Sequence, residues 1–398
     1  MGQQQSRQTG VCSSDAGQEQ LPANNLNNPS AHPDDNQAKT RFISWVSPAK
    51  GRNLVRPDLG PNTLSIPPIS MKVTVFSTLA FERPFLELAN GGRHELRFLE
   101  ASLNAITVAL AQGSEAVCVF APDDVSAPML EQLHAHGVRH VVVRAAGTDN
   151  VDLPAAHRLG LRVAHVPEYS PYAIAEHAVL MMLALCRHLR QASQQLRAND
   201  FCLDDLIGFD LHGKTVGIMG VGRIGGVLAG ILHGFGCRLL GVDVQPNPDL
   251  TAQYGLRYVA LPELCAQADI ISVHTPLTAE THHRIDDQLL AQMKRGVLLV
   301  NTGRGGVLDT EAALRALDSG QLGYLGLDVY EHEKGLFFRN HSLDQLRDPL
   351  YAKLLTYPNV FLTGHQAYLT REALTNIADA AVASLDAWGE GQPAPHQL

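Results

Sequence analysis

TVGIMGVGRIGGVLAGILHGFGCRLLGVD, residues 215–243, is the stretch that decides the fold of this chain. Its first apolar run, 216–219, is typical of a buried strand and leads directly into a cluster of glycines. After the glycines, apolar side chains recur at helical spacing, at Ile224, Val227, Leu228, Ile231 and Leu232. A second apolar run, 239–242, ends on Asp243. This order predicts a strand, a tight turn, a helix and a second strand, as in a parallel α/β sheet.

The glycines of the turn, Gly220, Gly222 and Gly225, fit the pattern G-x-G-x-x-G. The first permits a tight turn, the second lets the backbone approach a pyrophosphate, and the third lets the helix pack on the strand. The helix then presents free N–H groups to the phosphates. Asp243 is placed to accept hydrogen bonds from a ribose and to repel a 2′-phosphate, which favours NAD over NADP. A chance glycine cluster is the alternative, and the strand, helix and acid in register disfavour it.

The composition is ordinary for a globular protein. The chain has 398 residues, enough for two domains, a net charge of −9 and no basic stripe, so a nucleic-acid partner is not expected. Six cysteines are scattered without C-x-x-C spacing, which indicates reduced thiols and no metal site. The longest apolar run, 178–186, is too short to span a bilayer. We therefore expect a cytoplasmic protein with no membrane partner.

Residues 1–70 differ in kind from the rest, because Gln, Asn, Ser, Gly and Pro dominate and no apolar face recurs. Such a segment cannot bury enough surface to offset its ordering entropy, so we expect a disordered extension. Met71 begins MKVTVFS, which resembles a natural first strand, and an upstream misreading of the start codon is the alternative. The opening MGQQQS also fits the N-myristoylation pattern, which is frequent by chance.

The remaining chain predicts two parallel-sheet domains of the Rossmann-like or flavodoxin-like kind, with a cleft between them. Short β-rich runs alternate with helical patterns in 71–171, and Ser170 then caps a long connecting helix that runs to about Arg197. The dinucleotide-binding domain is expected over 172–369. The last helix, in 370–398, is expected to return to the first domain and complete a substrate domain with 71–171.

Three groups that can do chemistry follow predicted strands of the second domain: Arg304 in NTGRGG, Glu333 in GLDVYEHE and His365 in LTGHQAYLT. Ligand contacts in α/β sheets gather at such carboxyl strand ends. Arg can grip a carboxylate and polarise a ketone, and His can donate the proton that accompanies hydride addition. A carboxylate beside the histidine favours its protonated form, the role assigned to Glu333. Each alone is more often structural, but their joint placement indicates reduction of a 2-keto acid.

At these residues the chain resembles the D-isomer-specific 2-hydroxyacid dehydrogenases, from about Met71 to Pro393. The resemblance implies that Arg304, Glu333 and His365 are catalytic, with His365 as acid/base. It implies a homodimer or a higher homo-oligomer and a 2-keto or 2-hydroxy acid as the small-molecule partner. The cofactor contacts that it implies are Gly220, Gly222, Arg223, Ile224, Gly225, Asp243, His274, Thr302 and Asp328. The substrate contacts that it implies are Ala146 and Gly147, through backbone N–H groups, and the side chains of Tyr169 and Tyr368.

Two stretches resemble the bacterial fermentative D-lactate dehydrogenases of that family, GHQAYLT at 364–370 and the segment 335–355. The subgroup more often has Ser before the catalytic Arg, where this chain has NTGRGG. The leading interpretation is therefore NAD-dependent reduction of pyruvate to D-lactate. A broader 2-keto acid, hydroxypyruvate or glyoxylate reductase remains open, and so does an NAD-sensing regulator like the corepressors that share this fold.

Overall fold

The computed structural model describes residues 71–342 and 347–398, so the expectations for residues 1–70 lie outside the described residues. Its strands form two sheets, one of five strands and one of seven, and every pair of neighbouring strands in both is parallel. The central strands are buried along their whole length, as β3 and β6 illustrate, because helices cover both faces of a parallel sheet.

The first sheet has the strand order β2-β1-β3-β4-β5, which is the flavodoxin-like order. Its strands are β1 (Lys72–Val75), β2 (Glu95–Phe98), β3 (Ala116–Val119), β4 (His140–Val143) and β5 (Arg162–His165). Its helices are α1 (Arg83–Asn90), α2 (Ala127–Ala135) and α3 (Leu153–Arg158), with the short 3-10 helix η1 (Val108–Ala111). Strand β2 and helix α1 were not predicted, although α1 is amphipathic, with Leu86 buried and Leu88 exposed.

The second sheet has the order β12-β11-β10-β9-β6-β7-β8, which extends the doubly wound dinucleotide-binding order by one strand. Its strands are β6 (Thr215–Met219), β7 (Arg238–Val242), β8 (Arg257–Tyr258), β9 (Ile270–Val273), β10 (Val297–Asn301), β11 (Leu322–Leu327) and β12 (Val360–Leu362). Between them lie α6 (Arg223–Gly234), α7 (Pro248–Tyr254), α8 (Leu261–Gln267), α9 (Asp287–Gln292), η3 (Gly305–Val307), α10 (Thr310–Ser319) and α11 (Pro349–Thr356). The strand order reverses between β6 and β9, beside the glycine turn.

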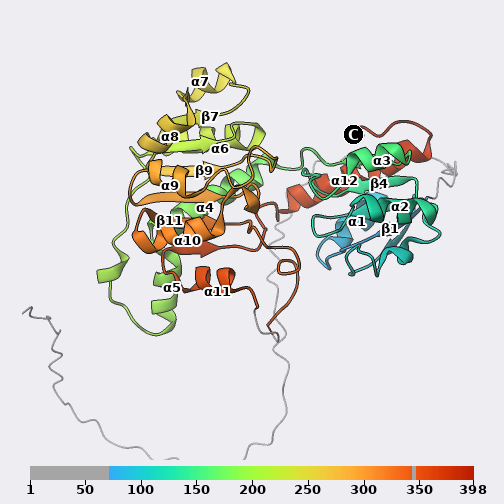
Figure 1. The fold of residues 1–398 in the computed structure, drawn as a ribbon, viewed down its shortest axis with the longest axis horizontal. Helices are drawn as coiled ribbons and strands as arrows, with labels where there is room; N and C mark the ends of the chain where they lie inside the picture. The colour runs from blue at the N-terminus through green and yellow to red at the C-terminus, as the bar shows by residue number, and fades with distance from the viewer. Residues whose placement is uncertain (1–70, 343–346) are drawn as a thin grey trace, which may run out of the picture. The chain divides into compact units, whose positions relative to one another are not determined.

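The last helix, α12 (Arg371–Gly389), packs against α1, β4 and β5 of the first sheet (Figure 1). Thr370 caps it by accepting a hydrogen bond from the Ala373 N–H, and Trp388 stacks on His140 of β4. Beyond the helix, Gln397 pairs with Ala164 in an antiparallel bridge to β5. The end of the chain therefore covers the edge of the first sheet.

The single long helix expected from residue 171 to about 197 is wrong, because the chain forms two helices that bend by 62° at their junction. Helix α4 (Pro171–Cys186), capped by Ser170, packs on α6, β10 and β11, and α5 (Leu189–Arg197) follows. The Cys186 carbonyl accepts from the Phe209 N–H instead of continuing the helix, and His188 adopts a left-handed conformation. A contact 23 residues downstream thus ends the helix.

Among the described residues, no single helix is long and apolar enough to cross a membrane. Helices α4 and α5 reach that length and apolarity only when they are taken together across their bend. The 3-10 helix η2 (Asp204–Leu206) follows α5 and leads the chain into β6.

Candidate active site

A cavity of about 90 Å³ opens where loops from the two sheets meet. The first sheet contributes the loops after β3 and β4, and the second contributes loops after β10, β11 and β12. One water needs about 10–15 Å³ of cavity volume, so the cavity holds roughly six to nine waters. That volume suits a small organic acid. The predicted residues that line it are Ala146, Gly147, Tyr169, Arg304, Glu333, His365 and Tyr368.

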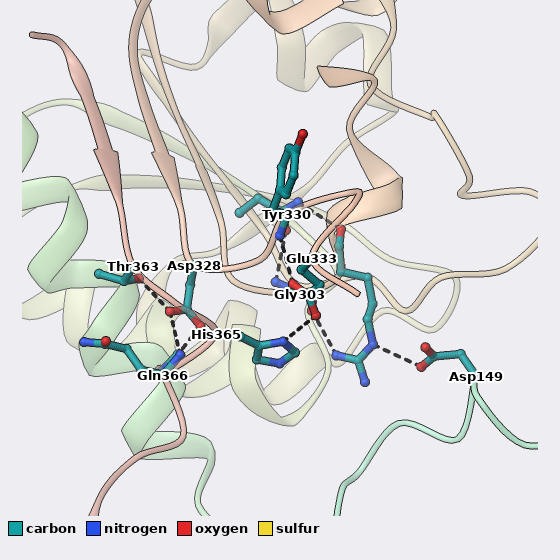
Figure 2. Close-up of polar contacts among 11 residues, drawn as sticks. Asp149, Gly303, Asp328, Tyr330, Glu333, Thr363, His365 and Gln366 are labelled. Carbon is teal, nitrogen blue, oxygen red and sulfur yellow. Dashed lines mark hydrogen bonds and ion pairs between the residues drawn. The ribbon is translucent and has the colours of Figure 1, made fainter. Parts of the chain in front are cut away.

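His365 and Glu333 form a hydrogen-bonded pair in this cavity (Figure 2). The Nδ1 atom of His365 lies 2.7 Å from Oε1 of Glu333, and the other carboxylate oxygen accepts from the Tyr330 N–H at 3.0 Å. Because Nδ1 is occupied by the carboxylate, Nε2 is the ring nitrogen left for a substrate. His365 also has a φ of 52°, a left-handed conformation that costs a non-glycine residue free energy and often marks a functional site.

Asp328, at the end of β11, anchors the loop that carries His365 (Figure 2). Its buried carboxylate accepts from the Thr363 hydroxyl at 2.6 Å and from the N–H groups of Gln366 and Ala367 at 2.9 and 3.0 Å. Burial opposes ionisation of this group, but hydrogen bonds from these donors and from His177 outweigh it and hold the pKa of Asp328 below its usual range. An ionised carboxylate thus fixes the position of the histidine backbone.

Arg304 lies in the loop after β10 and reaches Asp149 in the loop after β4. Its Nε donates to Oδ1 of Asp149 at 3.1 Å, and Nη1 donates to the Gly303 carbonyl at 2.9 Å. The Asp149 side chain is 48% exposed, so this ion pair is weak and a substrate carboxylate can replace it. A Cβ atom on Gly147 would lie 1.7 Å from Nη2 of Arg304, so only glycine allows this approach.

Aromatic rings close the rest of the cavity. Tyr368 lies 6.4 Å from Tyr169 and 6.0 Å from Phe120 between ring centroids, and Phe338 lies 5.6 Å from the His365 ring. Burial raises the pKa of both tyrosines, so each keeps a neutral hydroxyl at physiological pH. The site therefore combines one cation, one hydrogen-bonded histidine and an apolar wall.

Behind the wall, Arg144 is fully buried at the end of β4. Its guanidinium donates to both carboxylate oxygens of Glu82, at 2.8 and 3.2 Å, and to the carbonyls of Phe76 and Cys118 at 3.1 and 3.0 Å. A bidentate pair with further hydrogen bonds is the arrangement that a buried charge requires. Arg144 therefore joins the carboxyl ends of β1, β3 and β4 directly beneath the loop that begins at Ala145.

The glycine turn after β6 has the geometry that a dinucleotide requires. Gly220 has a φ of 86°, and a Cβ on Gly225 would lie 2.2 Å from the Gly220 carbonyl oxygen. A Cβ on Gly222 would meet no atom within 4 Å, so the surface above this glycine is open for a phosphate group. Asp243 accepts from the Val221 N–H at 2.6 Å and from the Gln245 N–H at 2.8 Å, which holds it beside the turn.

Two further cavities connect this turn to the catalytic cavity. The first, of about 860 Å³, is lined by Gly222 and Arg223, and these residues also line a second one of about 230 Å³. The second also contains Ile224 and His274, and it shares Ala146 and Tyr169 with the catalytic cavity. This path runs from the glycine turn to His365, as an extended cofactor requires.

His274 and Thr302 lie at the ends of β9 and β10, beside the turn. The His274 ring contacts the Ser272 hydroxyl at 2.9 Å and the Thr302 hydroxyl at 3.3 Å. Burial lowers the pKa of His274 to about 4, so the ring is neutral at physiological pH. A Cβ on Gly220 would lie 2.9 Å from the His274 backbone, so the backbone of His274 packs directly against the glycine turn.

Comparison with known proteins assigns this arrangement to a family. The sequence family described as "D-isomer specific 2-hydroxyacid dehydrogenase, NAD binding domain" matches residues 179–367. The D-lactate dehydrogenase of Escherichia coli (strain K12) is 44% identical over 329 residues, which are 82% of this chain and 100% of that protein. The chain belongs to the D-isomer-specific 2-hydroxyacid dehydrogenase family.

Solved structures agree with this assignment. The apo-structure of the Escherichia coli D-lactate dehydrogenase is similar with a TM-score of 0.74 at 42% identity, over 82% of this chain and 100% of that one. The Aquifex aeolicus D-lactate dehydrogenase, complexed with NAD and lactic acid, has a TM-score of 0.73 at 32% identity, over 80% of this chain and 96% of that one. As a member of this family, the protein is an NAD-dependent 2-hydroxyacid oxidoreductase, which confirms the predicted fold class, cofactor and reaction type.

The structure of this dehydrogenase brings the predicted catalytic and substrate residues into one cavity and lines the path beside it with most of the predicted cofactor residues. The sequence did not identify Asp149, although it lies two residues after the predicted substrate contact Gly147 and, unlike Asp152, caps no helix. It also missed the Arg144–Glu82 pair. A charged residue that ends the apolar run VVVR was a signal for Arg144, but nothing in the sequence links it to a partner 62 residues away.

Proposed function

We propose that this protein interconverts pyruvate and NADH with D-lactate and NAD. The observation that carries the proposal is the cavity of about 90 Å³, which has room for a small acid and is lined by both Arg304 and the His365–Glu333 pair. Relatives named D-lactate dehydrogenase, which match the chain over most of its length, support the same substrate.

Bound NADH supplies the hydride, and the chain's own residues supply binding and the proton. We assign the ribose to Asp243 and the phosphates to the turn at Gly220, Gly222 and Gly225, with Arg223 and Ile224 beside them. His274, Thr302 and Asp328, at the ends of neighbouring strands, are assigned to the nicotinamide half. Five of these residues line the path of cavities, namely Gly222, Arg223, Ile224, Gly225 and His274. Asp243 and Thr302 bond to Val221 and His274, which line it, and Gly220 and Asp328 are assigned from the resemblance to the family.

For the substrate, we assign the carboxylate to Arg304 and to the N–H groups of Ala146 and Gly147. Arg304 leaves its weak pair with Asp149 and presents a planar fork to the carboxylate and ketone. His365 donates the proton on Nε2 to the ketone oxygen as hydride reaches the carbon, and in the reverse direction it takes this proton from the hydroxyl. Glu333, at Nδ1, stabilises the imidazolium that this cycle needs.

The test is a substrate panel with purified full-length protein and NADH. Pyruvate, hydroxypyruvate, glyoxylate and longer 2-keto acids are compared by kcat/KM, and the product's handedness is read by chiral chromatography. We expect pyruvate to be preferred and D-lactate to be formed. Equal turnover of the whole panel would make the protein a broad 2-keto acid reductase. NADH binding without turnover of any panel member would instead favour a regulator.

We also propose that the enzyme is a homodimer or a higher homo-oligomer in the cytoplasm. Helix α5 and the residues after it expose several large apolar side chains, Leu189, Leu196, Phe201, Leu203 and Ile207. Large apolar side chains exposed in such number on one segment favour association. Sedimentation analysis of the full chain at micromolar concentration tests the assembly, and a purely monomeric profile would contradict it.

A further inference from the structure

In the loop after β4, the carbonyl groups of Ala145 and Ala146 both point toward the end of β5. The Ala145 carbonyl accepts from the Val166 N–H at 3.2 Å, and the Ala146 carbonyl lies 2.9 Å from Nδ1 of His165. Since a carbonyl oxygen can only accept, Nδ1 of His165 carries the hydrogen in this contact. Both donors come from the end of β5, so this strand fixes the direction of both carbonyls.

The direction of the carbonyls sets the direction of the N–H groups. In a trans peptide the C=O and the N–H point to opposite sides, and the described chain contains no cis peptide bond. The N–H groups of Ala146 and Gly147 therefore point away from β5, on the side where both residues line the catalytic cavity. No described residue accepts a hydrogen bond from either N–H, so both donors are available to an anion.

His165 is itself held in place. Its backbone N–H donates to the His396 carbonyl at 3.2 Å, and neighbouring Ala164 pairs with Gln397. The residue that reaches the Ala146 carbonyl is thus sandwiched between β4 and the end of the chain. Its side chain touches the loop from behind and is not part of the cavity lining.

We propose that His165 is a positioning residue that keeps the Ala146–Gly147 peptide turned with its N–H toward the substrate carboxylate. The inference rests on the proposed function, in which this loop and Arg304 share the carboxylate. Without the donor at Nδ1, the peptide is free to rotate and present the Ala146 carbonyl to the cavity. A carbonyl oxygen there would repel the carboxylate, so substrate binding weakens while proton transfer at His365 is unaffected.

The experiment compares His165→Leu, which removes the donor, with His165→Asn, whose side-chain amide can donate in place of Nδ1. We expect His165→Leu to raise the KM for pyruvate about tenfold, the value of one lost hydrogen bond, with kcat and the Kd for NADH within twofold of the parent. His165→Asn should restore KM. His157→Ala is the matched control. The His157 side chain, like that of His165, contacts a backbone carbonyl, but this carbonyl belongs to Leu398 at the end of the chain and lies away from the loop.

An unchanged KM in His165→Leu would overturn the inference, and so would a variant in which kcat, NADH binding and Tm fall together. Hydrogen exchange of the Val166 N–H, which donates to the Ala145 carbonyl of this loop, gives a readout that needs no turnover. Faster exchange in His165→Leu, but not in His165→Asn, supports the inference, and equal exchange in all forms overturns it. Failure of the parent enzyme on every 2-keto acid would instead contradict the proposed function, and the exchange data would still decide the role of His165.

Discussion

Two loops face each other across the catalytic cavity, and they use their backbone in opposite ways. In the loop 363–367, Asp328 accepts hydrogen bonds from the N–H groups of His365, Gln366 and Ala367, through its backbone carbonyl or its carboxylate. In the loop 145–147, the carbonyls of Ala145 and Ala146 accept hydrogen bonds from Val166 and His165 at the end of β5. The N–H groups of Ala146 and Gly147 have no acceptor among the described residues.

The difference matches what each loop must deliver. A loop that presents one side chain needs a rigid backbone, and Asp328 supplies it with an ionised carboxylate at the centre of the turn. A loop that presents its backbone needs free donors and close access, and glycine at 147 supplies the access. Hydrogen bonds thus fix the N–H groups of the loop 363–367 and the carbonyl groups of the loop 145–147.

Removing the side chain that the first loop presents should have the largest effect. His365→Ala takes away the proton donor, and we expect kcat for pyruvate reduction to fall by about 10²–10⁴-fold. NADH binding, measured by fluorescence titration, should stay close to that of the parent. His365→Asn is the matched variant, because Asn tolerates the left-handed conformation at φ 52°. Turnover near the parent level in both variants would remove His365 from the mechanism.

Blocking the backbone that the second loop presents should have the next largest effect. Gly147→Ala places a methyl group 1.7 Å from the present position of Nη2 of Arg304, so the guanidinium must move. A misplacement of about 1 Å can cost about 10²-fold, so we expect kcat/KM to fall by about that factor with little change in Tm. Gly234→Ala, at the end of α6 with no atom within 4 Å, is the control. Equal kinetics for both substitutions would show that Arg304 accommodates the methyl group.

Weakening the anchor of the first loop should alter stability and its pH dependence. Asp328→Asn turns one acceptor into a donor, which leaves a buried N–H facing another donor and costs about 1–3 kcal/mol at neutral pH. Because the folded-state pKa of Asp328 lies below its ordinary value of 3.8, its stabilisation is present above that pH and is lost on further acidification. Thermal unfolding from pH 7 to 3 should therefore show a Tm gap that narrows in acid. A constant gap would mean that Asp328 is not ionised in the folded protein.

The sequence predicted the second loop less completely than the first. The strand-end positions of Arg304, Glu333 and His365 follow from local apolar runs, and a parallel sheet brings its carboxyl ends together whatever the details of the loops. The glycine turn is also predictable from local sequence. A positive φ at Gly220 and a close backbone contact at Gly225 each require a residue without a Cβ atom.

The features that were missed depend on contacts between residues far apart in the chain. The pairing of Arg144 with Glu82 and that of Arg304 with Asp149 join elements whose register no local pattern reveals. The bend after Cys186 has the same origin, because residues near Phe209 cap the helix from outside. Helical periodicity continues through the bend, so a local pattern extends the helix where a tertiary hydrogen bond ends it.

Asp243 lies at the end of a third strand, β7, and its substitution should have the smallest effect of the four. Like Asp328, it already accepts two backbone N–H groups, from Val221 and Gln245. A carboxylate has further lone pairs, so it can still bond a ribose while it holds the turn. We expect Asp243→Ala to narrow the NADH over NADPH preference in kcat/KM by about tenfold, the value of one hydrogen bond of about 1.5 kcal/mol. An unchanged ratio with a lower Tm would mean that Asp243 acts as Asp328 does, as an anchor alone, and that another group selects the cofactor.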